Sequence, residues 1–166
     1  ENGINTYLFG DWDTPFGSMK INVELGRRLI KQFPMLKNDA RPFIDDITIE
    51  RQLPCLQFAK KDFLEKVRFL PILVGDAGYK KLVEFASVFA NVNAKVSIIC
   101  SCNFTRYGKE FGYVPFLHGI KENLHNMDGN LIDYVVKLDS RGFYENAKQI
   151  PEKNVLVLGI EIIKAM

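Results

Sequence analysis

The sequence predicts an α/β fold with a central, mostly parallel sheet and helices on both of its faces. Residues 67–74 and 95–101 are apolar, β-branched runs of the length typical of buried strands. Between these runs, apolar residues recur at the spacing of one helix face: Leu82, Phe85, Ala86 and Phe89. A strand, a helix and a second strand in this order predict a βαβ unit, whose two strands run parallel with a right-handed crossover.

The N-terminal elements are predicted from turn and capping residues. Residues 3–10 are typical of a short strand, and residues 11–18 carry turn chemistry around Thr-Pro-Phe-Gly. Asn22 can cap a following helix, which Pro34 ends. The inward face of this helix is predicted to consist of four apolar residues: Leu25, Leu29, Ile30 and Phe33.

Residues 47–60 predict a second helix, with Pro54 in a first turn rather than in the middle. The acidic pair Asp45-Asp46 precedes it, and a capping role accounts for this pair better than acid–base chemistry does. Asp11 and Asp13 form a similar pair in a turn. Acid–base work needs two carboxyls at a defined separation with different affinities for the proton, which a turn does not by itself provide.

The C-terminal half is predicted to be mostly helical. Asp76 can cap the helix of the βαβ unit. A long helical seam follows, formed by residues spaced three or four apart: Ile120, Leu124, Met127, Leu131, Val135 and Leu138. Residues 141–149 predict a short helix with Phe143 facing inward. Residues 154–163 fit a strand by propensity and a fully buried helix by periodicity, and the pattern leaves both open.

Length, charge and cysteine content limit the classes of protein to which the chain can belong. A length of 166 residues predicts a single domain over residues 1–166. The net charge of +2 does not call for nucleic acid. The cysteines Cys55, Cys100 and Cys102 are too few for a disulfide scaffold, so we expect a reducing, cytoplasmic compartment. No apolar run approaches the roughly 20 residues that span a bilayer, so we expect no membrane association.

The cysteines and histidines give little support for a metal site or for a nucleophilic cysteine. Cys100 and Cys102 lie two apart on a predicted strand, so both thiols point to one face. A metal site would need both of them together with His118 and His125, and such sites usually show close paired spacing. A Cys102 nucleophile would lack the glycine-rich elbow that usually follows one. Buried structural thiols explain these cysteines more simply.

The turn after residues 95–101 carries the candidate binding residues. An arginine beside an aromatic ring at a strand end can bind a phosphate, a phosphotyrosine or an acidic peptide. The alternative is that Arg106 pairs with a nearby acid and rigidifies the loop. The predicted binding surface consists of six residues in the loop 103–113: Asn103, Thr105, Arg106, Tyr107, Lys109 and Tyr113.

Several blocks of the chain resemble the MEMO family, whose fold is similar to that of class III extradiol ring-opening dioxygenases. Thr-Pro-Phe-Gly at 14–17 is similar to the family's Thr-Pro-Leu-Gly turn. Ile-Glu-Arg-Gln-Leu-Pro-Cys-Leu-Gln at 49–57 resembles its Ser-Ile-Glu-x-Gln-Leu-Pro-x-Leu-Gln stretch, and Leu-Pro-Ile-Leu-Val-Gly at 70–75 resembles Ile-Pro-Val-Leu-Val-Gly. Residues 101–108, followed by Phe111 and Tyr113, resemble the family's Ser-Ser-Asp-Phe-x-His-Tyr-Gly block. The order of the blocks carries the resemblance.

The resemblance implies that an ancestral metal site has been lost. In the family, histidine, cysteine and aspartate side chains contact metal or substrate. The matching positions here are Ile47 and Arg106 for histidines, Asn103 for the aspartate and, approximately, Pro151 for the cysteine. Isoleucine and proline offer no ligand atom, and a permanently cationic arginine repels a divalent metal. We therefore expect no catalytic residue, no metal and no cofactor in this chain.

The favoured hypothesis is a non-catalytic binding or scaffold protein with a protein or phosphorylated partner at the loop 103–113, rather than a small-molecule substrate. One alternative is a metal-dependent oxidoreductase of the ring-opening dioxygenase type, which would need ligands from segments outside these 166 residues. The other alternative is an accessory factor on a ribonucleoprotein assembly such as the ribosome, in contact with RNA.

Overall fold

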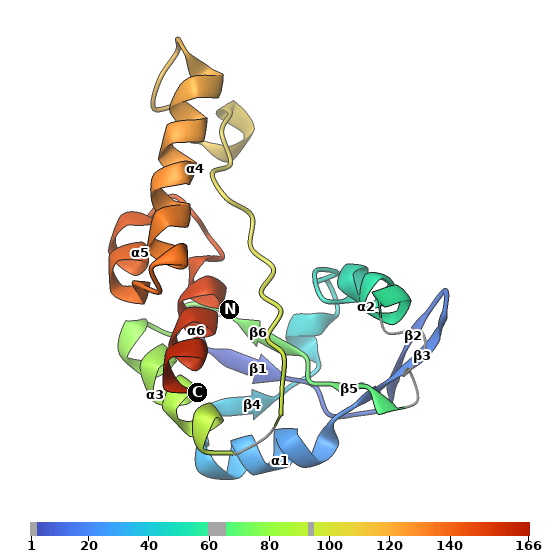
Figure 1. The fold of residues 1–166 in the computed structure, drawn as a ribbon. Helices are drawn as coiled ribbons and strands as arrows, with labels where there is room; N and C mark the ends of the chain where they lie inside the picture. Colours follow the sequence, from blue (N-terminus) through green and yellow to red (C-terminus); the bar gives the residue numbers. More distant parts are fainter. Residues whose placement is uncertain (1–2, 60–65, 93–94) are drawn as a thin grey trace. The chain divides into compact units, whose positions relative to one another are not determined.

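The computed structural model describes residues 3–59, 66–92 and 95–166, and these fall into two compact units. The first unit comprises Glu1–Asp76 and Asn91–Lys95, and the second comprises Ala77–Ala90 and Val96–Met166. The strands β1 to β6 lie in the first unit together with helices α1 and α2, and the second unit contains helices α3 to α6; Figure 1 labels these elements. The α/β class is thereby confirmed, whereas the expectation of a single domain stays a prediction.

One sheet of the first unit has the strand order β4-β1-β6. Its strands are β1 (Ile4–Thr6), β4 (Leu36–Asn38) and β6 (Ile72–Val74). The central strand β1 runs parallel to β4 and antiparallel to β6, and all three of its residues are buried (Figure 1). The Thr6 hydroxyl is buried with the strand and donates to the carbonyl of Pro71 over 2.8 Å, which satisfies the buried polar group.

The other sheet has the order β2-β3-β5, with β2 (Asp11–Thr14), β3 (Gly17–Ile21) and β5 (Arg68–Phe69). β2 and β3 form an antiparallel hairpin, and β5 runs parallel to β3. The predicted turn residues Pro15 and Phe16 connect the hairpin strands, and Gly17 adopts a positive φ of 100° there. The exposure pattern of β2 alternates, so Trp12 is half-buried while its neighbours Asp11 and Asp13 are exposed.

Helix α1 (Val23–Gln32) follows the prediction closely. The Asn22 side chain accepts a hydrogen bond of 3.1 Å from the backbone of Leu25, which confirms the predicted cap. The 3-10 turns η1 (Arg41–Phe43) and η2 (Glu50–Gln52) precede α2 (Leu53–Ala59), in which Pro54 is the second residue. The cap at Asn22 and the place of Pro54 near a helix start were predicted correctly, whereas the predicted helix start at residue 47 was wrong, because α2 begins at Leu53, and residue 60 lies outside the described residues.

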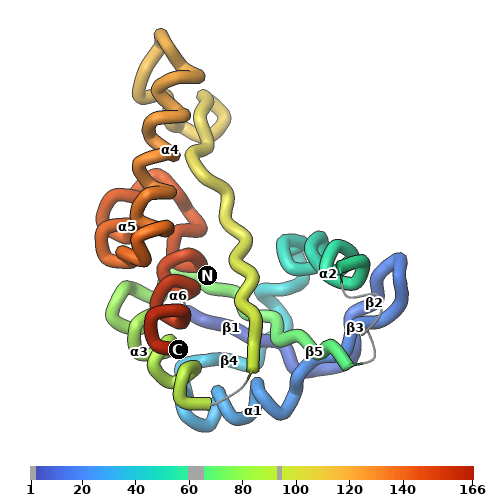
Figure 2. Tube along the Cα trace, in the orientation of Figure 1, coloured from blue at the N-terminus to red at the C-terminus, as the bar shows by residue number. Residues whose placement is uncertain are grey.

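The prediction of one mostly parallel sheet built on a βαβ unit was wrong for the described residues. Residues 95–107 form no strand there, and Figure 2 shows them as an extended trace. Residues 95–100 alternate between exposed and half-buried, and Ile99 is 60% exposed. The apolar pattern favours an extended backbone but does not choose a hydrogen-bonding partner, and both edges of β1 are already occupied by β4 and β6.

The second unit contains α3 (Tyr79–Asn91), η4 (Lys109–Phe111), α4 (Ile120–Val136), α5 (Ser140–Asn146) and α6 (Lys153–Ala165). Helix α3 begins at Tyr79, so Asp76 is not its capping residue, contrary to the prediction. The ambiguous residues 154–163 form α6, and most of its length is buried, which is why the pattern showed no one-sided period. Phe143 on α5 is fully buried, as predicted.

The seam of α4 is shorter than predicted. The helix ends at Val136, and Leu138 beyond it adopts a positive φ of 54°. Of the seam residues only Leu131 is fully buried. Neither α4 nor any other helix of the described residues combines the length and the apolar character needed to cross a bilayer.

A buried carboxylate connects three helices of the second unit. Glu161 on α6 accepts hydrogen bonds at Oε1 from the Ser140 hydroxyl on α5 and, over 2.8 Å, from the Lys164 ammonium. The Tyr79 hydroxyl on α3 lies 3.0 Å from Ser140 Oγ and 3.4 Å from the same Glu161 oxygen. Burial alone would raise the pKa of Glu161, but the hydrogen bonds from Lys164 and Ser140 and the charge of Lys164 outweigh burial and lower this pKa.

We predict that Glu161→Gln destabilises the protein by about 2 kcal/mol at pH 7, because hydrogen bonds to a charged group are lost. A folded pKa below the unfolded value of about 4.3 adds stability above that pH, and this stability is lost as pH falls through the folded pKa. Urea unfolding followed by helical circular dichroism at pH 7, 5, 4 and 3 measures both effects. The variant should show a flatter pH dependence between pH 5 and 3.

Glu145→Gln is the matched control, because Glu145 is an exposed acid on α5 paired with Arg141. Equal losses of stability in the two variants would contradict the role given to Glu161.

Candidate functional site

The loop 103–113 is fastened to the middle of helix α4 through Thr105. Its hydroxyl donates to Asp128 Oδ1 over 2.7 Å, and its backbone N–H donates to the same oxygen over 3.3 Å. Thr105 is half-buried, so these bonds hold the loop backbone in place rather than presenting the hydroxyl to solvent.

The two tyrosines of the loop also stabilise its shape. The Tyr107 hydroxyl donates to the carbonyl of Phe116 over 2.6 Å, and the two rings stack with centroids 5.3 Å apart. Gly108 and Tyr113 exchange both backbone hydrogen bonds, at 3.0 and 3.1 Å, which closes the loop around η4. Gly108 has a φ of 144°, a conformation that favours glycine.

Arg106 forms an ion pair with Glu152, the residue that precedes helix α6. The two side chains are 37% and 34% exposed. Nη2 of the guanidinium meets Oε1 of the carboxylate, while Glu152 Oε2 is buried without a hydrogen-bond partner among the described residues. The pairing of Arg106 with an acid is what the alternative interpretation of this residue expected, and the guanidinium keeps further donors that can meet a ligand.

The predicted site residues therefore divide into two groups. Thr105, Tyr107 and Tyr113 shape the loop. Asn103 and Lys109 are exposed, and Arg106 is partly exposed, so these three can meet a partner. The binding prediction itself is untested by this geometry.

The sequence analysis did not predict three of the residues that hold the loop in place. Asp128, Glu152 and Phe116 lie 23, 46 and 9 residues from the loop positions that they contact. Asp128 sits between apolar seam positions of a predicted helix and resembles an ordinary polar helix residue. One sequence feature could have pointed to Glu152: it follows Pro151, the position at which the family resemblance expects a cysteine.

Cys100 and Cys102 do not offer a preformed thiolate to a divalent metal. Burial, followed by the charge of Glu152 and the neighbouring Cys100, raises the pKa of Cys102 to about 12, although Arg106 acts in the opposite direction. Burial also raises the pKa of Cys100, whose Sγ lies 3.6 Å from the carbonyl of Val155. Both thiols hold their protons near neutral pH, and a metal ion would have to displace these protons because ligation needs a thiolate. In the described part of the chain, no three potential metal ligands of the His, Cys, Asp or Glu type lie together.

We predict that the three cysteines differ strongly in reactivity towards a disulfide reagent at pH 8. Cys55 is exposed and should react at once, whereas Cys100 and Cys102 should react at least tenfold more slowly, because little thiolate forms. Release of thionitrobenzoate from the native protein and from Cys55→Ser measures this difference. Rapid reaction of two or more thiols in the folded protein, with Cys102→Ser abolishing one of them, would contradict the assignment.

Comparison with known proteins agrees with this picture of the fold. A family model described as "Memo-like protein" matches residues 1–166. Among curated relatives, a MEMO1 family protein of Pyrococcus abyssi is 30% identical over 158 residues, which cover 89% of this chain and 53% of the relative. A second, from Thermoplasma volcanium, is 29% identical over 90% of this chain and 49% of its own length. The chain spans about half the length of these two relatives. It belongs to the MEMO family.

Proposed function

We propose that this chain is a non-catalytic MEMO-family binding protein that has lost the ancestral metal site and engages a phosphorylated segment of a protein partner through the loop 103–113. The observation that carries the proposal is the ion pair between Arg106 and Glu152. Arg106 stands where the family resemblance expects a histidine, and its charge is balanced by a carboxylate rather than directed at a metal.

The order of the loop supports a recognition role. Bonds from Thr105 to Asp128 and from Tyr107 to Phe116 fix the backbone on both sides of Arg106. A binding group held in place loses little conformational entropy when its partner arrives. The loop thus keeps a defined shape although its residues do not provide a metal site.

The charges of the exposed residues favour an anionic ligand. Arg106 can offer N–H groups beyond the one that meets Glu152, and Lys109 adds a second cation on the same loop. Glu152 competes with an incoming phosphate for the guanidinium. Removal of its charge should therefore strengthen phosphate binding, whereas a purely structural ion pair would give no gain in binding.

The two alternative functions receive no specific support. An oxidoreductase of the ring-opening type would need metal ligands from the part of the relatives' length that this chain does not cover. A role in a ribonucleoprotein rests only on the small positive net charge.

We predict that O-phosphotyrosine, used as the probe, shifts the backbone amide signals of residues 103–113 in a saturable way. Arg106→Ala should weaken the affinity about tenfold, since a charge-assisted hydrogen bond is lost, and Glu152→Gln should strengthen it. The measurement is a titration of the isotopically labelled protein by NMR. Unmodified tyrosine serves as the ligand control.

Arg141→Ala is the matched control variant, because Arg141 also pairs with a glutamate on an exposed surface of the second unit. An unchanged affinity in Arg106→Ala, or an equal loss in Arg141→Ala, would contradict the proposal. Binding of a single-stranded RNA with a steep salt dependence, without phosphotyrosine binding, would favour the ribonucleoprotein alternative. A stoichiometric transition metal in the purified protein would favour the oxidoreductase.

A further inference from the structure

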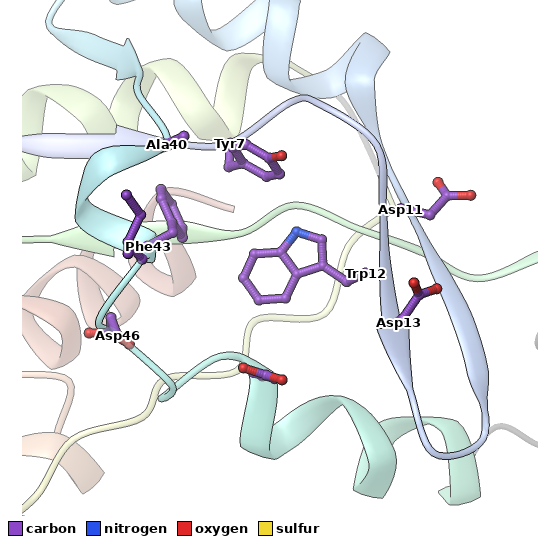
Figure 3. Close-up of a pocket in the computed structure, with 9 residues that line it drawn as sticks. Tyr7, Asp11, Trp12, Asp13, Ala40, Phe43 and Asp46 are labelled. Carbon is purple, nitrogen blue, oxygen red and sulfur yellow. The ribbon is translucent and has the colours of Figure 1, made fainter.

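The first unit contains a cavity of about 340 Å³ that the sequence analysis did not anticipate. Nine residues line it, and they come from the loop after β1, from β2, and from residues 40–50, a stretch that includes η1 and the first residue of η2 (Figure 3). Its volume lies at the lower end of the range for small-molecule sites and far above that of a bare metal ion. The cavity lies wholly within the first unit and involves none of the residues in the loop 103–113.

Three aromatic rings form one part of the cavity wall. The ring centroids of Tyr7, Trp12 and Phe43 lie 6.0 to 6.3 Å from one another, and the ring planes are inclined by 43° to 87°. Figure 3 shows these rings gathered on one side of the β2 strand. Each of the three residues is only half-buried, so the rings are not enclosed in the core and can contact a ligand.

The Trp12 side chain also packs against a residue outside the cavity wall. Phe69 of β5 meets the indole edge-on with centroids 5.5 Å apart. Because side chains alternate along β2, the indole points to one face of the hairpin and the carboxylates of Asp11 and Asp13 to the other, as Figure 3 shows. The hairpin therefore fixes an aromatic surface rather than a flexible side chain.

Acidic residues surround these rings. Asp46 and Glu50 line the cavity, and Asp46 is oriented by the hydrogen bond that its Oδ1 accepts from the Thr48 N–H over 2.8 Å. Asp11 and Asp13 add negative charge from the other face of β2. None of these four acids forms an ion pair within the described ranges 3–59, 66–92 and 95–166.

Two nearby cations, Arg41 and Lys20, each lie close to an acid other than Asp46 and Glu50. Arg41 is turned to Asp39, with Nη2 and Oδ2 2.6 Å apart. Lys20 lies opposite Asp11 in the hairpin register, hence on the face of β2 away from Trp12. A negatively charged ligand is therefore disfavoured, and a positively charged one is attracted.

We propose that this cavity binds an organic cation with a methylated ammonium head. Such a head is large and weakly hydrated, so the faces of aromatic rings can replace its water, and the ring quadrupoles attract its charge. Asp46 and Glu50 supply the counter-charge. An unmethylated ammonium would instead lose strong hydration, and a neutral apolar ligand would gain nothing from the carboxylates.

The fluorescence of Trp12 tests the proposal directly, because Trp12 is the single tryptophan of the chain. Choline is the probe, 3,3-dimethylbutan-1-ol is its neutral counterpart of the same shape, and sodium chloride controls for ionic strength. Choline should change the emission in a saturable way. The neutral alcohol should bind at least fivefold more weakly, since the attraction between the charge and the rings is lost.

Two pairs of variants measure separately how much the rings and the acids contribute to choline affinity. Phe43→Leu should weaken choline binding about fivefold, whereas Phe58→Leu, at an exposed aromatic residue of α2 outside the cavity, should not. Glu50→Gln should weaken it about threefold through the loss of one near-surface charge, and Glu24→Gln on α1 should leave it unchanged. Glu50 is exposed, so this variant keeps the test decisive if Phe43→Leu fails to fold.

A peptide with a trimethylated lysine, compared with the same peptide carrying ordinary lysine, distinguishes the two sources of this chemistry. Tighter binding of the methylated peptide than of choline would assign the site to a protein segment, and the reverse order to a free small molecule. Equal binding of choline and the neutral alcohol would overturn the proposal, as would the absence of a saturable signal. Neither result bears on the phosphate proposal, because the rings and Arg106 belong to different units.

Discussion

The buried carboxylate of Glu161 is the interaction on which the arrangement of the second unit depends. It joins α6 to α5 through Ser140 and to α3 through Tyr79. A carboxylate removed from water is favourable only when its oxygens are paired, and the lysine one turn later supplies the positive charge. Because α6 is fixed in this way, its first turn is fixed as well, and Glu152 immediately before that turn is placed against Arg106.

The elements that the sequence predicted well are those that local chemistry decides. Asn22 caps its helix because its side chain reaches an N–H three residues away, and Pro54 tolerates only the start of a helix. Residues 95–101 were mispredicted because a strand exists only with a neighbour, and the neighbour is chosen by contacts distant in sequence. Residues 154–163 were ambiguous because a helix buried on most sides shows no polar face.

The same distinction applies to the sites. The loop residues from Asn103 to Tyr113 were predicted as a site because they cluster in the sequence, and this stays a prediction, whereas the partners that fix the loop include residues of α4 and the residue before α6. The aromatic cavity was missed because Tyr7, Trp12 and Phe43 share no sequence motif, and because its acids were interpreted one pair at a time as turn or capping residues. The capping prediction was wrong in detail: Asp46 accepts the N–H of Thr48 in a local turn, while Ile49 precedes η2 without a side-chain cap, and Asp46 also lines the cavity.

If Arg106 replaces a metal-binding histidine, as proposed above, the arginine has a physical consequence of its own. Histidine can be neutral at a metal, whereas a guanidinium keeps its charge and needs an acceptor wherever it is partly buried. Glu152 provides that acceptor beside Pro151, where the resemblance expects the family's cysteine. The same carboxylate also raises the pKa of Cys102, which makes the nearby thiol a still poorer metal ligand. One ion pair thus balances the charge of Arg106 and raises the cost of forming a thiolate at Cys102, so the proposed function treats Arg106 and Glu152 as a pair.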